Sequence, residues 1–223
     1  IVVELAGGYD LPKEWILTAL KNKKHVVTAN KALIAKHGAE LFPVAAENGC
    51  ALLFEAAIGG GIPIIKAMQE SLVGNRFNSL NCIINGTCNY IMTEMTEKGS
   101  QYKKTLKIAQ ELGYAEADPT FDVEGIDSAH KTAILASICS KKYVDFEKMF
   151  VSGISTIEPV DIEIAKEMGY CIKLLGTVAL TDDGVDARVH PCLISHDHLL
   201  ANVNGVLNAV YLKTDNLGPT LQT

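Results

Sequence analysis

The chain has 223 residues, of which 48% are hydrophobic and 21% charged, a composition typical of a globular protein rather than a disordered segment. Its net charge is −6 and it has no basic run, so we expect no nucleic-acid partner. No stretch reaches the roughly 18 consecutive apolar residues of a membrane helix, and the acidic Glu4 is unlike a signal peptide, so we expect no membrane partner.

The six cysteines are scattered among apolar neighbours, and no two of them form a C-x-x-C pair. A zinc site or a disulfide framework requires tighter and repeated spacing, so we expect neither. We interpret the cysteines as reduced core residues, which favours a reducing compartment and a cytoplasmic protein.

The first 57 residues alternate strand-like and helix-like patterns. Residues 1–8 form an apolar run that ends in a glycine pair, and Pro12 suits the first turn of a helix. Asn30 is a suitable N-cap for a helix over residues 31–47. The expected strands are 1–8, 25–28 and 51–58. This order predicts the tail end of a Rossmann-like parallel sheet, an α/β fold.

After residue 57 the strand-like runs increasingly follow one another directly, which indicates an α+β region with a mixed sheet. The sequence Thr181-Asp182-Asp183-Gly184 predicts a hairpin between two antiparallel strands. The expected strands are 80–84, 172–180, 186–194 and 206–212. The expected helices lie near 62–73, 88–98, 102–112, 126–140 and 159–169.

The segment 113–131 (GYAEADPTFDVEGIDSAHK) is rich in carboxylates and leads into a helix whose continuation is apolar on nearly every face. We expect that helix to be buried. Asp127 and Lys131 lie four residues apart on one face of it. Such a pair is usually a solvated salt bridge, but charges that lead into a core must face a partner or a cavity. The pair is therefore a candidate for moving a proton, whereas His130 points elsewhere and is expected to be a core or interface residue.

From Ala109 to Lys131 the chain follows the order A-x-x-x-G-Y-x-x-x-D-P-x-x-D-V-x-G-x-D-x-x-x-K, which resembles the homoserine dehydrogenase signature. Three further segments agree with that family, namely 27–33 (VTANKAL), 55–63 (EAAIGGGIP) and 85–90 (NGTCNY). The resemblance covers essentially the whole chain, with Cys88 where the family often has threonine.

The resemblance implies an NAD(P)-dependent oxidoreductase that interconverts L-aspartate 4-semialdehyde and L-homoserine in the synthesis of threonine, methionine and isoleucine. It implies that Lys131 donates the proton to the carbonyl oxygen, and that Lys31 touches cofactor and substrate and shares this work. The implied residues for the amino acid substrate are Glu116, Asp127, Asp122, Tyr114 and Thr87. Gly113 would approach the nicotinamide of NADP or NAD. Without the family, Lys31 is an exposed lysine at a helix start and Gly113 a helix C-cap.

By the same resemblance, the turn at 59–63 would bind a monovalent cation, usually sodium. Its oxygens would come from Glu55 and from the backbone carbonyls of Ile58, Gly60 and Ile62. Neutral carbonyls with one carboxylate suit a hard cation of low charge. The spacing alone favours a flexible strand-to-helix turn without a metal.

We divide the chain into the C-terminal part of a nucleotide-binding domain (1–57), a substrate-binding catalytic domain (58–200) and a dimerisation strand that returns toward the nucleotide domain (201–223). No G-x-G-x-x-G is present, so the chain resembles a truncated enzyme. The apolar run 206–212 predicts an edge strand and a homodimer, unless the run is buried within one subunit.

Two other functions remain open. Another semialdehyde dehydrogenase would need a nucleophilic cysteine, for which only Cys88 is a weak candidate. A non-catalytic fragment that dimerises or binds amino acids is the other alternative.

Overall fold

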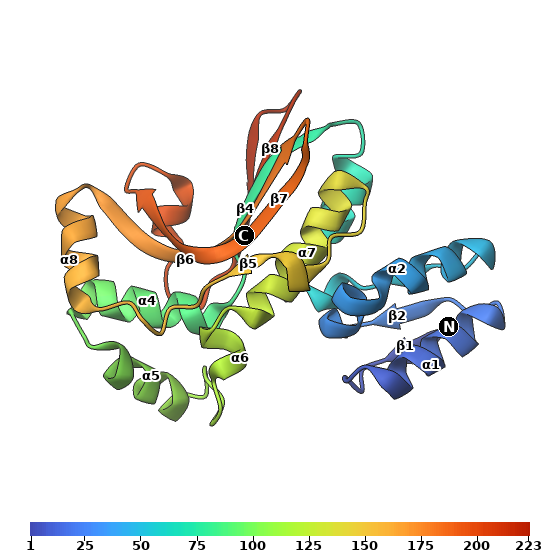
Figure 1. Ribbon diagram of the computed structural model, residues 1–223, viewed down its shortest axis with the longest axis horizontal. Coiled ribbons are helices and arrows are strands. Elements are labelled where there is room, and N and C mark those ends of the chain that lie inside the picture. Colours follow the sequence, from blue (N-terminus) through green and yellow to red (C-terminus); the bar gives the residue numbers. More distant parts are fainter.

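The computed structural model describes residues 1–223 and contains two β-sheets with helices packed on them (Figure 1). A three-stranded sheet has the order β1-β2-β3, and a six-stranded sheet has the order β5-β7-β6-β4-β8-β9. In Figure 1 the first sheet and its two helices form the right-hand part of the molecule, and the second sheet lies to the left. The fold thus joins an α/β unit to an α+β unit, which confirms the predicted fold class.

The first sheet consists of short parallel strands connected by two helices. The bounds are β1 Val2–Glu4, α1 Asp10–Lys21, β2 Val26–Thr28, α2 Lys31–Glu47 and β3 Leu52–Leu53. Asn30 caps α2 as predicted, since its side-chain oxygen accepts a hydrogen bond from the Leu33 N–H at 3.1 Å. The strand expected over 51–58 is too long, because a 3-10 helix begins at Glu55 and turns the chain away from the sheet.

The second sheet is antiparallel, except where β5 runs parallel to β7. Its strands are β4 Phe77–Ile83, β5 Phe150–Val151, β6 Tyr170–Thr181, β7 Gly184–Ser195, β8 Ala209–Thr214 and β9 Pro219–Gln222. The predicted hairpin is confirmed, with Thr181 opposite Gly184. The expectation that 206–212 forms an edge strand is wrong, because β8 lies between β4 and β9 and its residues 209, 210 and 212 are buried.

Helices cover the second sheet and connect it to the first. They are α3 Ile64–Lys66 with a π-helical continuation Ala67–Ser71, α4 Gly86–Lys98, α5 Tyr102–Glu111, α6 Thr120–Val123, α7 Ile126–Ser140 and α8 Pro159–Glu167. The five predicted helices of this region are present, and the short α6 was not predicted. Short 3-10 helices lie at Glu55–Ala57, Phe146–Lys148 and Leu199–Asn202.

Helix α7 is the central element, because it packs on β6 and β7 and also contacts α2. Gly176 of β6 permits the close approach, since a Cβ at this position would overlap the Thr132 hydroxyl of α7. Ile134 of α7 and Ile34 of α2 belong to one apolar core cluster that extends through both parts of the molecule. The start of α2 is thereby fixed relative to the start of α7.

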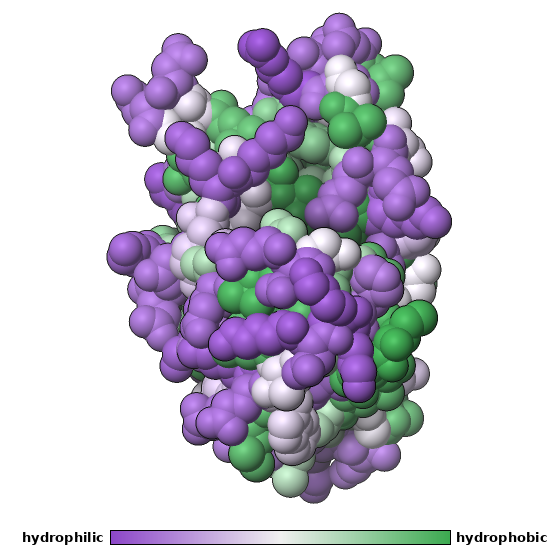
Figure 2. Space-filling model, turned by 90° about the vertical axis from the view of Figure 1, so that its right-hand side faces the viewer, coloured by the Kyte–Doolittle hydropathy of each residue, from purple (hydrophilic) through white to green (hydrophobic).

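All six cysteines are free, which agrees with the expectation of no disulfide framework. No helix combines the length and apolarity that crossing a membrane requires. A cavity of about 440 Å³ lies between α2 and the end of α7 and is lined mostly by apolar side chains, among them Phe42, Met68 and Ile138. Figure 2 shows hydrophobic residues inside a hollow between the two parts of the molecule. None of the predicted site residues lines this cavity.

Candidate active site

Two lysines and one aspartate from distant parts of the sequence form a buried ionic cluster. Lys131 Nζ lies 2.6 Å from Asp127 Oδ2, and Lys31 Nζ lies 2.9 Å from Asp127 Oδ1. Asp127 is only 3% exposed, whereas Lys31 and Lys131 remain partly accessible. Lys131 also donates a hydrogen bond to the Ile84 carbonyl at 3.0 Å. A single carboxylate therefore neutralises part of the charge of two accessible ammonium groups.

Asn85 joins a second carboxylate to this cluster. Its side-chain N–H groups donate to Asp122 Oδ1 at 2.8 Å and to Asp127 Oδ2 at 3.0 Å. Its side-chain oxygen caps α4 by accepting the Cys88 N–H at 2.8 Å. This bridging role was not predicted from the sequence, although an asparagine directly before a helix is itself an N-cap signal.

The pKa values of the two carboxyl groups are shifted in opposite directions. Burial acts to raise the pKa of Asp127, but Lys131, Lys31 and the Asn85 amide together lower this pKa below its ordinary value. Burial raises the pKa of Asp122, and the negative charge of Asp127 adds to this effect while the Asn85 hydrogen bond opposes it. Neighbouring acids with divergent pKa values are typical of sites that transfer protons.

The other predicted substrate residues lie in the loop after α5 and in the first turn of α4, which follows Asn85. Glu116 is exposed and its carboxylate makes no hydrogen bond or ion pair within the chain. Tyr114 is also exposed, and its ring packs on Tyr90 with 4.9 Å between the ring centroids. The Thr87 hydroxyl donates to the Tyr114 carbonyl, so it ties the loop after α5 to the start of α4. Gly113 has φ +78° in that loop, and nothing lies within 4 Å of its Cβ position.

His130 is a core residue, as predicted, and is not part of the cluster. It is buried, and its ring makes edge contacts with Phe121 and Phe146. Burial lowers the pKa of His130, which favours the neutral imidazole.

Cys88 has the environment of a packing residue. It is fully buried in the first turn of α4, and its thiol donates to the Asp122 carbonyl at 3.2 Å. Burial raises the pKa of Cys88 well above its usual value, and the charge of Asp122 adds to this. A thiolate nucleophile is therefore strongly disfavoured at this position.

The loop after β1 lies at the same edge of the sheet as Lys31. The buried Glu4 carboxylate accepts hydrogen bonds from the Ala6 and Gly7 amides and from the Thr28 hydroxyl. The Asn30 amide donates to the Gly8 carbonyl at 2.8 Å. These contacts were not predicted from the sequence, and they fix the loop at the carboxyl ends of the strands, where ligands bind in open α/β sheets.

The turn at residues 58–63 offers carbonyl oxygens but no cluster of metal-ligating side chains. The carbonyls of Ile58 and Gly60 accept no hydrogen bond, whereas the Ile62 carbonyl accepts one from the Ile64 N–H. The two Glu55 oxygens accept the amides of residues 65 and 66 at 2.8 and 2.9 Å. Of the four groups expected to bind a cation, only the carbonyls of Ile58 and Gly60 are thus free of hydrogen bonds.

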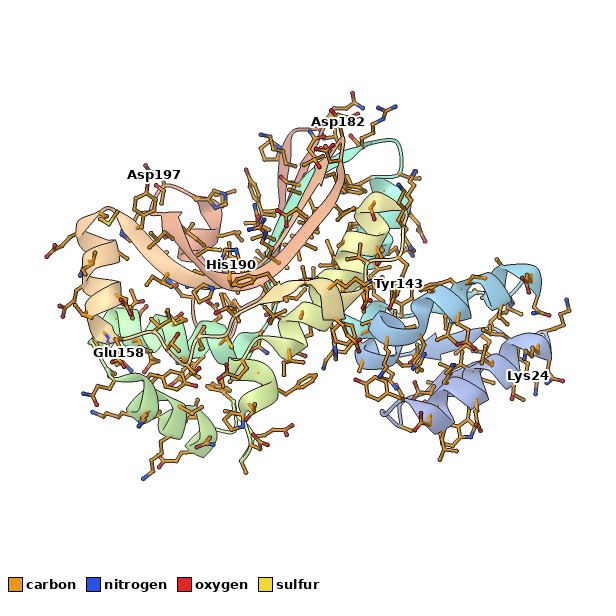
Figure 3. All side chains as sticks on the ribbon, viewed as in Figure 1. Lys24, Tyr143, Glu158, Asp182, His190 and Asp197 are labelled. Atoms are coloured by element: carbon orange, nitrogen blue, oxygen red, sulfur yellow. The ribbon has the colours of Figure 1, made fainter.

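A hydroxyl at the other end of α7 joins it to α2. Tyr143 follows α7 and points toward α2 (Figure 3). Its hydroxyl lies 2.8 Å from the Ala35 carbonyl and 3.1 Å from the Lys36 carbonyl. The ion pair between Lys31 and Asp127 is the corresponding polar contact at the start of α7, and both contacts involve the first two turns of α2.

Comparison with known proteins identifies relatives along nearly the whole chain. Residues 1–55 match the family described as "Homoserine dehydrogenase, NAD binding domain", and residues 63–223 match "Homoserine dehydrogenase". The homoserine dehydrogenase of Pseudomonas aeruginosa is 56% identical over 99% of this chain, and that of Bacillus subtilis is 44% identical over the same share. The chain spans about half the length of these curated relatives, 51% in both cases.

Solved structures agree with these relatives. The crystal structure of a homoserine dehydrogenase from Thiobacillus denitrificans has a TM-score of 0.96 and 51% identity, covering 99% of this chain and 52% of that one. A hyperthermophilic archaeal homoserine dehydrogenase in complex with NADPH has a TM-score of 0.83 and 28% identity, covering 99% of this chain and 64% of that one.

Proposed function

Since the chain belongs to the homoserine dehydrogenase family, we propose that the complete enzyme interconverts L-aspartate 4-semialdehyde and L-homoserine with NADP or NAD. This reaction belongs to the synthesis of amino acids derived from aspartate. The observation that carries the proposal is the cluster of Lys31, Asp127 and Lys131, because two ammonium groups around one buried carboxylate suit proton transfer to a carbonyl oxygen.

Lys131 is the proposed proton donor. An ammonium group has three N–H bonds, and Lys131 uses one for Asp127 and one for the Ile84 carbonyl. The third N–H is left for the aldehyde oxygen of the semialdehyde. The bound nicotinamide cofactor supplies the hydride. As the carbonyl is reduced, Lys131 transfers its proton to the oxygen, and Asp127 stays ionised and keeps the lysine oriented.

Acidic residues beside Lys131 are proposed to bind the amino acid part of the substrate. The exposed Glu116 carboxylate has no partner in the chain and is free to bind the substrate ammonium. Asp122 and Asp127 lie on the two sides of Asn85, where they add negative charge near the substrate. We propose that Tyr114 and Thr87 shape the opening of this site, because the Thr87 hydroxyl holds the loop that carries Tyr114.

Lys31 and Gly113 are proposed to contact the cofactor. The residues fit a nicotinamide cofactor, because Lys31 follows the carboxyl end of β2, and Glu4 and Asn30 fix the adjacent loop after β1 by hydrogen bonds. Gly113 leaves open space above its backbone, which a flat ring requires.

A monovalent cation such as sodium is a further proposal for the turn at residues 58–63. The free carbonyls of Ile58 and Gly60 fit a hard cation of low charge. Glu55 already accepts two backbone amides, so its contribution would use the remaining lone pairs of its oxygens. A cation here would stabilise the turn and take no part in proton transfer.

We also propose a cytoplasmic homodimer with the domain boundaries 1–57, 58–200 and 201–223. The free cysteines support a reducing compartment. Leu207, 61% exposed in the segment before β8, supplies apolar surface near the edge strand β9. Light scattering on the full-length enzyme should give twice the subunit mass at micromolar concentration. A monomer mass would exclude the dimer.

The direct test of the proposed function is an assay of NADPH or NADH oxidation with aspartate semialdehyde on the full-length protein. We expect consumption of the reduced cofactor and formation of homoserine. Reduction of NADP⁺ or NAD⁺ with oxidation of the aldehyde would instead indicate another semialdehyde dehydrogenase, which the buried Cys88 disfavours. Binding of amino acids without turnover would indicate a non-catalytic protein.

A further inference from the structure

Lys173 is a buried cation that the proposed reaction does not use. It lies in β6 and is only 3% exposed. Its ammonium group donates to the Val203 carbonyl at 2.8 Å, to Asn204 Oδ1 at 2.8 Å and to Asn89 Oδ1 at 3.1 Å. All three N–H bonds are satisfied, but every acceptor is a neutral oxygen and no carboxylate is paired with the charge.

Asn89 of α4 extends this network along the segment 203–207. Its side-chain N–H groups donate to the Val203 carbonyl at 3.0 Å and to the Leu207 carbonyl at 3.1 Å. One turn further along α4, the Thr93 hydroxyl oxygen accepts the Gly205 N–H at 3.1 Å. The segment 203–207 is therefore bound along one side of α4 at several points.

The same segment reaches the first turn of α4, where the candidate active site begins. A Cβ on Gly86 would lie 3.0 Å from the Val206 carbonyl oxygen, so the two backbones are in close contact. Gly86 follows Asn85, and the backbone N–H of Asn89 donates to the backbone carbonyl of Asn85 at 3.1 Å. The Lys173 network is thus one helical turn from the side chain that bridges Asp122 and Asp127.

A buried charge without a counter-ion is costly, and burial lowers the pKa of Lys173 accordingly. An apolar side chain of similar volume, such as methionine, would avoid this cost. Methionine cannot, however, bind three oxygens from two separate chain segments. The lysine is best explained by the directional bonds that it makes.

We propose that Lys173 is a positioning residue of the reaction. Through Asn89 and the segment 203–207 it fixes the first turn of α4, and it thereby holds Asn85 between Asp122 and Asp127. This inference rests on the proposed function for its kinetic consequences. Its structural content, an ordered first turn of α4, is independent of that function.

The test compares Lys173→Met with Leu175→Ala in the full-length enzyme. Leu175 is 6% exposed, lies two residues further along β6 and packs in the apolar cluster that contains Val203. Its truncation weakens the same layer without removing the polar network. Amide hydrogen exchange of residues 85–93 and the pH profile of kcat are measured for both variants, together with their Tm.

We expect Lys173→Met to increase exchange at residues 85–89 and to lower kcat about tenfold or more, as displaced site groups do. The acidic limb of the kcat profile should move to higher pH, because a displaced Asn85 no longer lowers the pKa of Asp127. At a similar loss of Tm, Leu175→Ala should show neither change. The proposal is overturned if both variants behave alike, or if Lys173→Met changes Tm only.

A second pair of variants covers the case in which Lys173→Met does not fold. Asn204 is exposed, so its replacement leaves the core intact. Asn204→Ala should increase exchange at residues 85–89 and lower kcat severalfold, and Asn204→Asp, which keeps an oxygen acceptor, should restore both. Equal exchange in the two Asn204 variants contradicts the proposal. If the wild type lacks dehydrogenase activity, the exchange data still decide it.

Discussion

Lys31 Nζ lies 2.9 Å from Asp127 Oδ1, and this ion pair joins the first residue of α2 to the first turn of α7. The two residues belong to different parts of the molecule, the three-stranded sheet and the six-stranded sheet. Since Asp127 also binds Lys131 at 2.6 Å, the position of the proposed proton donor depends on how α2 packs against α7. The geometry of the site is therefore a property of the junction between the two units.

Replacement of Lys31 tests this junction. Lys31→Ala removes one of the two cations around Asp127, and we expect kcat/KM to fall about tenfold to a hundredfold, as for the loss of a charge-stabilising donor. Lys36→Ala is the matched control, because Lys36 is an exposed lysine on the same helix outside the cluster. Steady-state kinetics should leave this control within about twofold of the wild type, as for a surface substitution. Equal effects of the two changes on kcat/KM would contradict the proposed role of Lys31 in the site.

Asn85→Ala should expose the repulsion between Asp122 and Asp127. The variant loses the amide that donates to both carboxylates, so the pKa of each carboxyl should rise. The acidic limb of the kcat profile should therefore move to higher pH. Loss of the helix cap should also lower stability by about 1 kcal/mol. A pH profile of kcat and a Tm measurement check the two effects. Asn48→Ala, at the C-terminus of α2, is the control and should leave the pH profile unchanged.

The pH dependence of stability reports on Asp127. The pKa of Asp127 is lower in the folded than in the unfolded protein, so its ionised carboxylate stabilises the fold. This contribution is complete above about pH 4, the ordinary pKa of aspartate, and it is lost as the pH falls through the lower pKa of the folded state. Asp127→Asn leaves two ammonium groups without their anion and should cost about 3 kcal/mol at pH 7. In urea unfolding, the difference in the free energy of unfolding between the wild type and Asp127→Asn should become smaller below about pH 4. A difference that is independent of pH would contradict the ionised state of Asp127.

Cys88→Ser distinguishes the proposed chemistry from a covalent thiol mechanism. A serine hydroxyl can donate to the Asp122 carbonyl as the thiol does, so turnover should stay within about threefold of the wild type, as for a conservative change outside the chemistry. Steady-state turnover and alkylation with iodoacetamide are the measurements. Loss of all turnover in a folded Cys88→Ser variant would restore the alternative of an aldehyde-oxidising enzyme.

The sequence predicts those parts of the fold and site that depend on local pattern. The pair of Asp127 and Lys131 follows from helical spacing and an apolar continuation, and the hairpin at residues 181–184 follows from its turn residues. Asn85 and Lys173 were missed because their partners come from segments far away in the sequence. Their roles depend on tertiary contacts that no local spacing encodes.

The errors in strand assignment also have tertiary causes. The strand expected at 51–58 ends at Leu53 because the Glu55 carboxylate binds the amides at the start of α3. The run 206–212 was mistaken for an edge because the short β9, which begins with a proline, gives no clear strand signal and yet pairs with β8. Val206 and Leu207 instead belong to the segment 203–207, which contacts α4.

The most direct test of the account is the turnover of Lys131→Ala in the full-length enzyme, measured as oxidation of NADPH with aspartate semialdehyde. Lys103→Ala, an exposed lysine on α5, is the control. If Lys131 donates the proton, its variant should fold, bind substrate and lose about a hundredfold or more in kcat, while the control keeps normal turnover. Near-normal turnover of a folded Lys131→Ala variant would contradict the assignment and transfer the proton-donor role to Lys31.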